Sequence, residues 1–253
     1  MARATTASIH IDALRHNLAQ IRAAAPQSKV MAVVKADGYG HGLERVAHAL
    51  VGADAFGVAA LSDAQRLRAA GLSQKIVLLS GFDEASDLDQ LRQLSVVTVV
   101  HHESQLEVLR QDSGAPVSVW LKMDSGMHRL GFPPDCYQRV YSQLQAMPNV
   151  ADDIVLMSHF ASSDELDNPQ TPSQISCFDQ YRNGVPGACS LANSSAVLSW
   201  PGARRQWLRA GGALYGLTVA AGKTGADFGL KAAMTLSTRL ISIQHVSAGE
   251  HVG

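Results

Sequence analysis

The sequence predicts an α/β fold, a (β/α)8 TIM barrel with a short extension at each end. Eight short apolar segments recur along the chain, with amphipathic stretches between them. Strict alternation of strand and helix implies right-handed crossovers and a parallel sheet. Eight such units in 253 residues favour a closed barrel over an open doubly wound sheet. An open sheet would need a Gly-x-Gly-x-x-Gly turn after its first strand, and Lys35–Gly42 lacks that spacing.

The predicted strands are short, and several are apolar throughout. Ile76–Leu79 and Ile154–Met157 are continuous apolar runs, the pattern of parallel strands that are covered on both faces. The intervening helices show the other period, as in residues 43–50, where apolar residues recur at i, i+3, i+4 and i+7. The strands are predicted at residues 29–34, 55–60, 75–80, 96–101, 117–122, 154–159, 189–193 and 206–210.

The first segment, residues 1–28, precedes the barrel. It is predicted to form a short strand, Ala7–Ile11, followed by a helix that Asp12 caps. One face of this helix is apolar and should pack on the barrel, through Leu14, Leu18 and Ile21.

The barrel itself is expected at residues 29–229, and residues 230–253 follow it. Met234–Val246 alternates in the manner of a β-strand and leads into a turn, after which the sequence stops at Gly253. A lone arm without partners is marginal in water. We therefore expect residues 230–253 to be the start of a truncated β-domain; the alternative is a C-terminal strand packed on the barrel.

Composition narrows the class of partner. Lys and Arg number 21 against 22 Asp and Glu, so no bulk charge attracts nucleic acid or an anionic membrane. The three cysteines do not make a disulfide framework, which favours a reducing cytoplasm. Neither a secretory leader nor an apolar stretch of roughly 18 residues is found. A small-molecule partner is expected.

Polar side chains follow the predicted strands at the end where barrel active sites lie. Two lysines, two arginines and a histidine would meet there, which suits an anionic ligand. No metal site is predicted: His101-His102-Glu103 lacks a third ligand and fits surface histidines at a helix start. The strand-end residues are Lys35, Tyr39, Lys122, Asp124, Arg129, His159, Asn193, Ser194, Arg209, Gly211 and Gly212.

Lys35 ends the first barrel strand and is followed by a glycine-rich turn. Position alone leaves open whether it is buried, with a lowered pKa suited to imine formation, or reaches to solvent. The ends of the seventh and eighth strands form a recurrent phosphate site in barrels. Ser194 at a helix start and the Gly211-Gly212 pair suit such a site. Together with Lys35 they suggest a phosphorylated aldehyde cofactor, pyridoxal 5′-phosphate.

Five segments in order resemble the bacterial alanine racemases. They are Val33–Gly42, Lys122–Gly131, Ser158–Ala161, Ala192–Ser195 and Leu208–Gly216, and they extend over almost the whole chain. The resemblance implies a pyridoxal-phosphate barrel followed by a β-domain and a head-to-tail homodimer. It also implies interconversion of L- and D-alanine, for peptidoglycan precursor supply or D-alanine catabolism.

The resemblance further implies a cofactor-binding set. Lys35 would be the Schiff-base lysine, and Tyr39 and Ser194 would bind the phosphate. Asn193 would lie beside them, with the backbone of Gly211 and Gly212 contributing. Arg209 would face the pyridine nitrogen, where a permanently charged guanidinium disfavours protonation of that nitrogen.

Three residues would act in catalysis. Lys35 would be the acid and base for the D-enantiomer, and Arg129 would contact the substrate carboxylate and the cofactor's phenolic oxygen. His159 would lie between Arg209 and the opposite base. Lys122 matches a lysine that is carbamylated in some members; carbamylation and a plain ion pair remain equally open.

The family's second base is a tyrosine that closely follows a Gly-Glu-x-Val-Gly segment, and here Gly249–Gly253 ends the sequence. Two-base racemisation needs proton carriers on both faces of a planar carbanion. We therefore expect cofactor binding with impaired racemisation in this chain. Two alternatives remain: a non-catalytic pyridoxal-phosphate homeostasis barrel, and a class I aldolase, in which the lysine would lie on a later strand.

Overall fold

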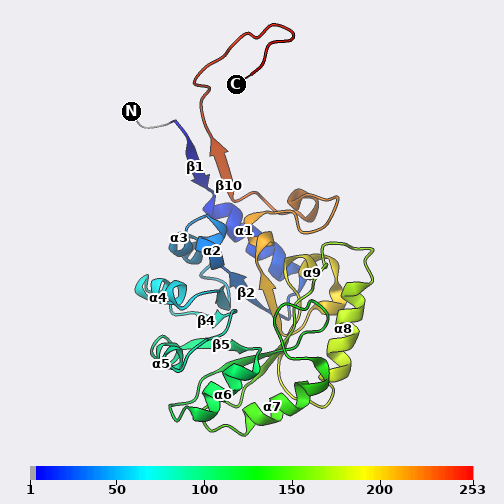
Figure 1. The fold of residues 1–253 in the computed structure, drawn as a ribbon. Coiled ribbons are helices and arrows are strands. Elements are labelled where there is room, and N and C mark those ends of the chain that lie inside the picture. The colour runs from blue at the N-terminus through cyan, green and yellow to red at the C-terminus, as the bar shows by residue number, and fades with distance from the viewer. Residues whose placement is uncertain (1–3, 253) are drawn as a thin grey trace.

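The computed structural model describes residues 4–252 and contains a closed parallel barrel of eight strands in sequential order, which confirms the (β/α)8 prediction (Figure 1). Every strand predicted for the barrel is present, and most end one to three residues early. The barrel strands are β2 (Lys29–Val33), β3 (Ala55–Val58), β4 (Lys75–Leu78), β5 (Val96–Val100), β6 (Val119–Lys122), β7 (Val155–Met157), β8 (Cys189–Ser190) and β9 (Trp207–Ala210).

Helices alternate with the strands and surround the barrel (Figure 1). They are α1 (Ile11–Ala24), α2 (Lys35–Tyr39), α3 (Leu43–Ala49), α4 (Leu61–Ala69), α5 (Ala85–Gln93), α6 (Glu103–Gln111), α7 (Tyr137–Gln145), α8 (Gln170–Tyr181) and α9 (Ser194–Ser199). Short 3-10 turns are η1 (Pro134–Cys136), η2 (Pro201–Ala203), η3 (Gly212–Tyr215) and η4 (Gly225–Phe228). The apolar residues predicted to face inward in 43–50 are fully buried.

The inside of the barrel is filled by apolar side chains, so it is a packed core rather than a pore. Near its amino-terminal end the rings of Trp120 and Trp207 lie 5.6 Å apart. The ammonium groups of Lys29 and Lys75 lie over the Trp207 ring, at 5.4 and 6.0 Å. This packing closes one end, so a ligand can enter only at the carboxyl ends of the strands.

The N-terminal helix differs from the prediction in its cap. Helix α1 begins at Ile11, and His10, whose backbone is extended, is the N-cap residue without a side-chain cap bond. Asp12 therefore lies inside the first turn, where its charge favours the helix dipole but caps no N–H. Leu14, Leu18 and Ile21 are buried as predicted.

The two ends of the chain meet in a small antiparallel sheet. Strand β1 (Thr6–Ile9) pairs with β10 (Met234–Ser237), in register from Thr6 opposite Ser237 to Ile9 opposite Met234. The strand predicted at 234–246 is therefore wrong beyond Ser237, because β1 offers only four residues for pairing. The following segment extends away from the barrel (Figure 1). The boundaries after residues 28 and 229 stay a prediction, and residues 1–3 and Gly253 lie outside the described part.

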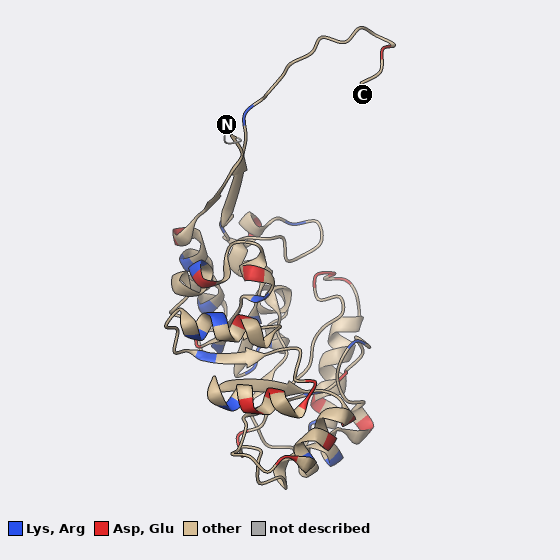
Figure 2. Ribbon diagram, turned by 60° about the vertical axis from the view of Figure 1, so that its left-hand side comes forward, with Lys and Arg blue, Asp and Glu red and all other residues tan. Residues whose placement is uncertain are grey.

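Charges of both signs are spread over the outer helices (Figure 2). In residues 4–252, every helix is too short or too polar to span a lipid bilayer.

Candidate active site

A cavity of about 470 Å³ opens at the carboxyl ends of the barrel strands. That size suits a small-molecule ligand. Its walls come from almost every strand-to-helix connection, and its apolar floor includes Val33, Leu79 and Met157. Of the eleven strand-end residues predicted to meet here, all except Asp124 line the cavity: Lys35, Tyr39, Lys122, Arg129, His159, Asn193, Ser194, Arg209, Gly211 and Gly212.

The cavity is strongly cationic. Lys35, Lys122, Arg129 and Arg209 line it together with a single carboxylate, that of Asp164. Within residues 4–252, none of these four cations has a carboxylate within ion-pair distance. Uncompensated positive charge is costly to build, so the arrangement fits an anionic ligand.

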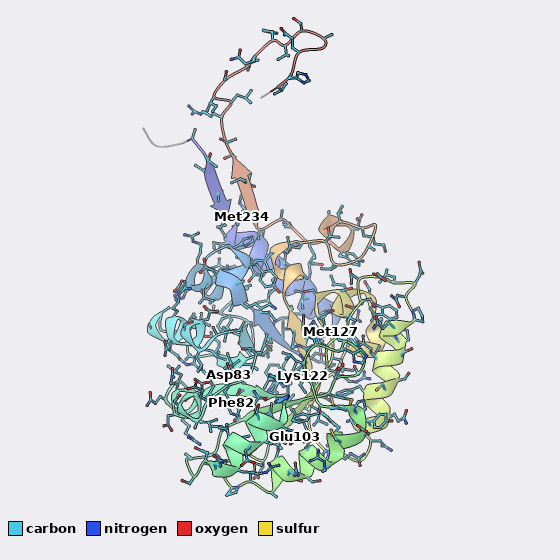
Figure 3. All side chains as sticks on the ribbon, in the orientation of Figure 1. Phe82, Asp83, Glu103, Lys122, Met127 and Met234 are labelled. Atoms are coloured by element: carbon cyan, nitrogen blue, oxygen red, sulfur yellow. The ribbon has the colours of Figure 1, made fainter. Side chains whose placement is uncertain are left out.

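The buried lysine of the cavity is Lys122, the last residue of β6, labelled in Figure 3. Its side chain is 5 % exposed. Burial and the nearby Arg209 and Arg129 lower the pKa of Lys122 to about 8. Lys35 is instead exposed on the cavity wall, because β2 ends at Val33 and the chain has already turned. The buried amine of the cavity is therefore Lys122 rather than Lys35.

Arg209 lies fully inside the site. One terminal nitrogen donates to the backbone O and the hydroxyl of Ser190, at 2.8 and 2.7 Å. The other donates to the backbone O of Ser158 at 2.7 Å and of Leu191 at 3.1 Å. It also donates to Nδ1 of His159 at 3.0 Å. Burial lowers the pKa of Arg209 to about 10, so the guanidinium stays charged at neutral pH.

This contact fixes the protonation of His159. An arginine can only donate, so Nδ1 of His159 is the acceptor and a neutral ring carries its proton on Nε2. Burial, with the charges of Arg209 and Lys122 nearby, holds the pKa of His159 well below its usual range. His159 is therefore neutral and presents an N–H.

Tyr39 is placed by an unusual turn. The backbone of Ala36, Asp37, Gly38 and Tyr39 is left-handed, with φ between 52° and 63°. The segment labelled α2 is thus one left-handed helical turn, and left-handed backbone costs about 1–2 kcal/mol for each residue with a side chain. Two features require glycine at position 38. Its backbone is left-handed, and a Cβ there would lie 3.0 Å from Cγ2 of Val46.

The turn directs the Tyr39 hydroxyl against the backbone of Gly211. A Cβ on Gly211 would lie 2.4 Å from that oxygen, so only glycine permits the approach. Burial raises the pKa of Tyr39, and its O–H is a donor at neutral pH.

Further donors lie beside Tyr39. Ser194 Oγ accepts from the N–H of Gly211 at 2.8 Å and of Ala213 at 3.1 Å. Both its lone pairs are used, which leaves its O–H free to donate into the cavity. No acceptor among residues 4–252 faces the N–H of Gly212. Asn193 is committed differently: its side-chain oxygen caps α9 at Ala196 N and accepts from Ser163 Oγ.

Arg129 is carried by the loop after β6. Oδ1 of Asp124 accepts from three successive backbone N–H groups, those of Gly126, Met127 and His128, each at 3.0 Å. These hydrogen bonds fix the conformation of the loop. Arg129 lies at its end, where its exposed side chain lines the cavity.

Sequence reasoning missed several polar residues of the wall: Ser80, Ser195 and Thr218, and the neighbouring pair Ser163 and Asp164. Ser163 and Asp164 are the ones whose position in the chain could have revealed them. They follow His159 by a few positions, and a count past the end of the strand into its loop would have included them. Within the described range 4–252, no three His, Cys, Asp or Glu side chains gather closely enough to hold a metal. His102, singled out in the sequence, caps α6 through Nδ1.

Comparison with known proteins gives a single answer. The family model "Alanine racemase, N-terminal domain" matches residues 9–219. The alanine racemase of Shewanella loihica is 52% identical over 248 residues, which are 98% of this chain and 69% of that protein. The biosynthetic alanine racemase of Pseudomonas aeruginosa superposes with a TM-score of 0.95 at 42% identity, over 99% of this chain and 70% of its own. The structure of alanine racemase from Acinetobacter baumannii gives 0.92 at 34% identity, over 100% and 71%. The chain therefore belongs to the alanine racemase family.

Proposed function

We propose that this protein interconverts L- and D-alanine with pyridoxal 5′-phosphate, bound covalently at Lys35. The observation that carries the proposal is the presence, in one cationic cavity, of a reachable primary amine and a cluster of donors for a phosphate. When bound, the cofactor would withdraw electrons from the substrate's α-carbon.

The residues present fit the cofactor's phosphate. The hydroxyls of Tyr39 and Ser194 and the N–H of Gly212 supply neutral donors. The close approach of Tyr39 to Gly211 leaves a cradle that a side chain at that position would fill. Asn193 supports this group by ordering the start of α9 rather than by presenting its oxygen.

Arg209 suits a ring nitrogen. Its two terminal nitrogens are occupied by protein acceptors, while no acceptor in residues 4–252 faces its Nε–H. A guanidinium has no lone pair to offer, so a pyridine nitrogen held opposite it would accept a hydrogen bond and stay unprotonated. This would weaken electron withdrawal and favour return of the proton to the α-carbon over other reactions.

Lys122 suits carbamylation. With its pKa lowered to about 8, a large share of the amine is neutral near that pH and can add carbon dioxide. The resulting anion would be surrounded by Arg129, Arg209 and Lys35, and would orient Arg129 toward a substrate carboxylate. Labelled bicarbonate should give a carbamate carbon signal in NMR that Lys122→Met abolishes.

Lys35 is the proton carrier on its own face of the substrate. Tyr39 is the only tyrosine of residues 4–252 that lines the cavity, and its hydroxyl is turned to the phosphate end. Among residues 4–252, Lys35 is thus the one exposed lysine of the cavity, and no second tyrosine lines it to serve the opposite face of the substrate. We propose that this protein exchanges the α-proton of D-alanine faster than it racemises D-alanine.

Borohydride reduction of the cofactor complex, digestion and mass spectrometry should place a pyridoxyl group on Lys35; a label elsewhere would falsify the assignment. In heavy water, D-alanine should then lose its α-proton faster than L-alanine. Lys35→Arg should abolish both the label and the exchange, whereas Lys223→Arg, at an exposed lysine outside the cavity, should abolish neither. Cofactor binding without any exchange would instead favour a carrier protein.

The cellular setting follows from the same chemistry. D-alanine made in the cytoplasm would serve as a peptidoglycan precursor, or the reverse reaction would begin its catabolism. We expect a homodimer, and sedimentation velocity on the purified protein tests this.

A further inference from the structure

We propose that Tyr215 and His41, neither of which lines the cavity, are positioning residues that set the affinity for the cofactor's phosphate through Tyr39. The inference rests on the proposed cofactor. Both side chains are buried: Tyr215 is 2 % exposed and His41 is 7 % exposed. Because neither side chain reaches the cavity, each can change ligand affinity only by positioning a residue that contacts the ligand.

Tyr215 is a fixed platform. It ends η3, which begins at Gly212 immediately after the backbone that approaches Tyr39. Its hydroxyl donates to the backbone O of Val33 at 3.1 Å, and its own backbone O accepts from Ala233 N at 3.1 Å. The ring is therefore tied to the end of β2, and the backbone of Tyr215 is tied to the residue that precedes β10.

Tyr39 lies flat on this platform. The two rings have centroids 4.7 Å apart and an angle of 26° between planes, an offset-stacked geometry. The stacked ring places the Tyr39 hydroxyl against Gly211. Since Tyr39 has a left-handed backbone, which opposes this placement, contacts with its side chain must hold it there.

His41 holds the same turn from its other end. Its ring centroid lies 4.8 Å from that of Tyr215, and its Nδ1 lies 2.9 Å from the backbone O of Tyr39. A carbonyl can only accept, so Nδ1 is the donor. The pair thus fixes both the ring and the backbone of Tyr39, and couples the exit of β2 to the exit of β9.

The test compares pyridoxal 5′-phosphate with pyridoxal, which lacks the phosphate. Tyr215→Leu removes the platform, and Tyr215→Phe keeps the ring as a matched control. Tyr215→Leu should raise the dissociation constant for pyridoxal phosphate about tenfold, the size expected for a lost hydrogen bond to a charged group. Its constant for pyridoxal should stay within about twofold of the unmutated protein's. Tyr215→Phe keeps the stacked ring but loses the bond to Val33, so it should weaken pyridoxal phosphate less than Tyr215→Leu does and leave pyridoxal within about twofold.

A second pair of measurements isolates the route. In a Tyr39→Phe background, Tyr215→Leu should have no further effect on phosphate affinity, because there is no hydroxyl left to position. His41→Leu, which should disturb the fold less, should weaken pyridoxal phosphate severalfold and pyridoxal hardly at all. Equal losses for both ligands, or a full effect without the Tyr39 hydroxyl, would overturn the inference. Failure of the unmutated protein to bind either ligand would overturn the proposed cofactor instead.

Discussion

Arg209 shows how much one buried side chain can hold together. Five acceptors from two strand exits, those of β7 and β8, converge on its two terminal nitrogens. Without a carboxylate partner, its charge is balanced only by these dipoles, so their loss is expensive.

Arg209→Lys keeps the charge but supplies only three N–H groups, so at least two buried acceptors lose their partner. We expect the free energy of unfolding to fall by about 2–6 kcal/mol, at about 1–3 kcal/mol for each of two unpaired groups. Urea denaturation measures this. The matched control is Arg205→Lys, at a partly exposed arginine paired with Asp179, which should cost about 0.5 kcal/mol or less. Equal losses at the two sites would contradict the argument.

Lys122 makes stability depend on pH. Its pKa is about 8 in the folded chain against 10.5 for an ordinary lysine, so between these values the unfolded chain binds the extra proton. Stability therefore rises with pH through this window and is insensitive to Lys122 below it. Relative to Lys122→Met, the unmutated protein should gain about 3 kcal/mol between pH 8 and 10.5 in buffer free of carbon dioxide. A difference that stays flat or falls, measured by denaturation at each pH, would show that Lys122 is not desolvated.

At the scale of elements, the left-handed turn α2 is the feature that pattern reasoning could not supply. Short apolar segments, separated by amphipathic stretches, predicted each barrel strand, because a strand that is buried on both faces has an apolar sequence. The turn leaves none beyond its glycines: Ala36 and Asp37 adopt left-handed backbone only because neighbouring contacts demand it. The prediction of a strand at 234–246 was wrong beyond Ser237 for a related reason: an alternating sequence pattern carries no information about the length of the partner strand.

Replacing alanine by glycine should have opposite effects on the free energy of unfolding in this turn and in a right-handed helix. Ala36→Gly removes the Cβ that opposes left-handed backbone, and should raise the free energy of unfolding by about 0.5–1 kcal/mol after the entropy of the unfolded chain is counted. Ala69→Gly, at an exposed alanine in the right-handed helix α4, should lower it by about 1 kcal/mol. Thermal melting of both variants decides; two losses would mean that the turn is not strained at Ala36.

At the scale of the molecule, the sequence predicted which residues meet but not how they are joined. The rule that barrel sites form at the carboxyl ends of strands brought together residues as distant as Lys35 and Arg209. It did not predict that Lys122, rather than Lys35, would be the buried amine, because burial depends on where each strand ends. Nor did it identify Tyr215 and His41, which act from behind the cavity wall. Such residues have no polar signature at a strand end.

The segment after β10 carries most of the large exposed apolar side chains of residues 4–252. Leu240, Ile241 and Ile243 are 83 %, 99 % and 72 % exposed, within a chain whose net charge is only −1. Contiguous exposed apolar side chains promote association when charge repulsion is weak. Replacing the three by serine should shift sedimentation toward the smallest species at a given concentration. Cofactor binding should be unaffected, since none of the three lines the cavity. Val51→Ser, at an apolar residue that is 50 % exposed on the barrel, should leave sedimentation unchanged. If the triple variant associates as the unmutated protein does, the contacts between copies lie elsewhere on the barrel.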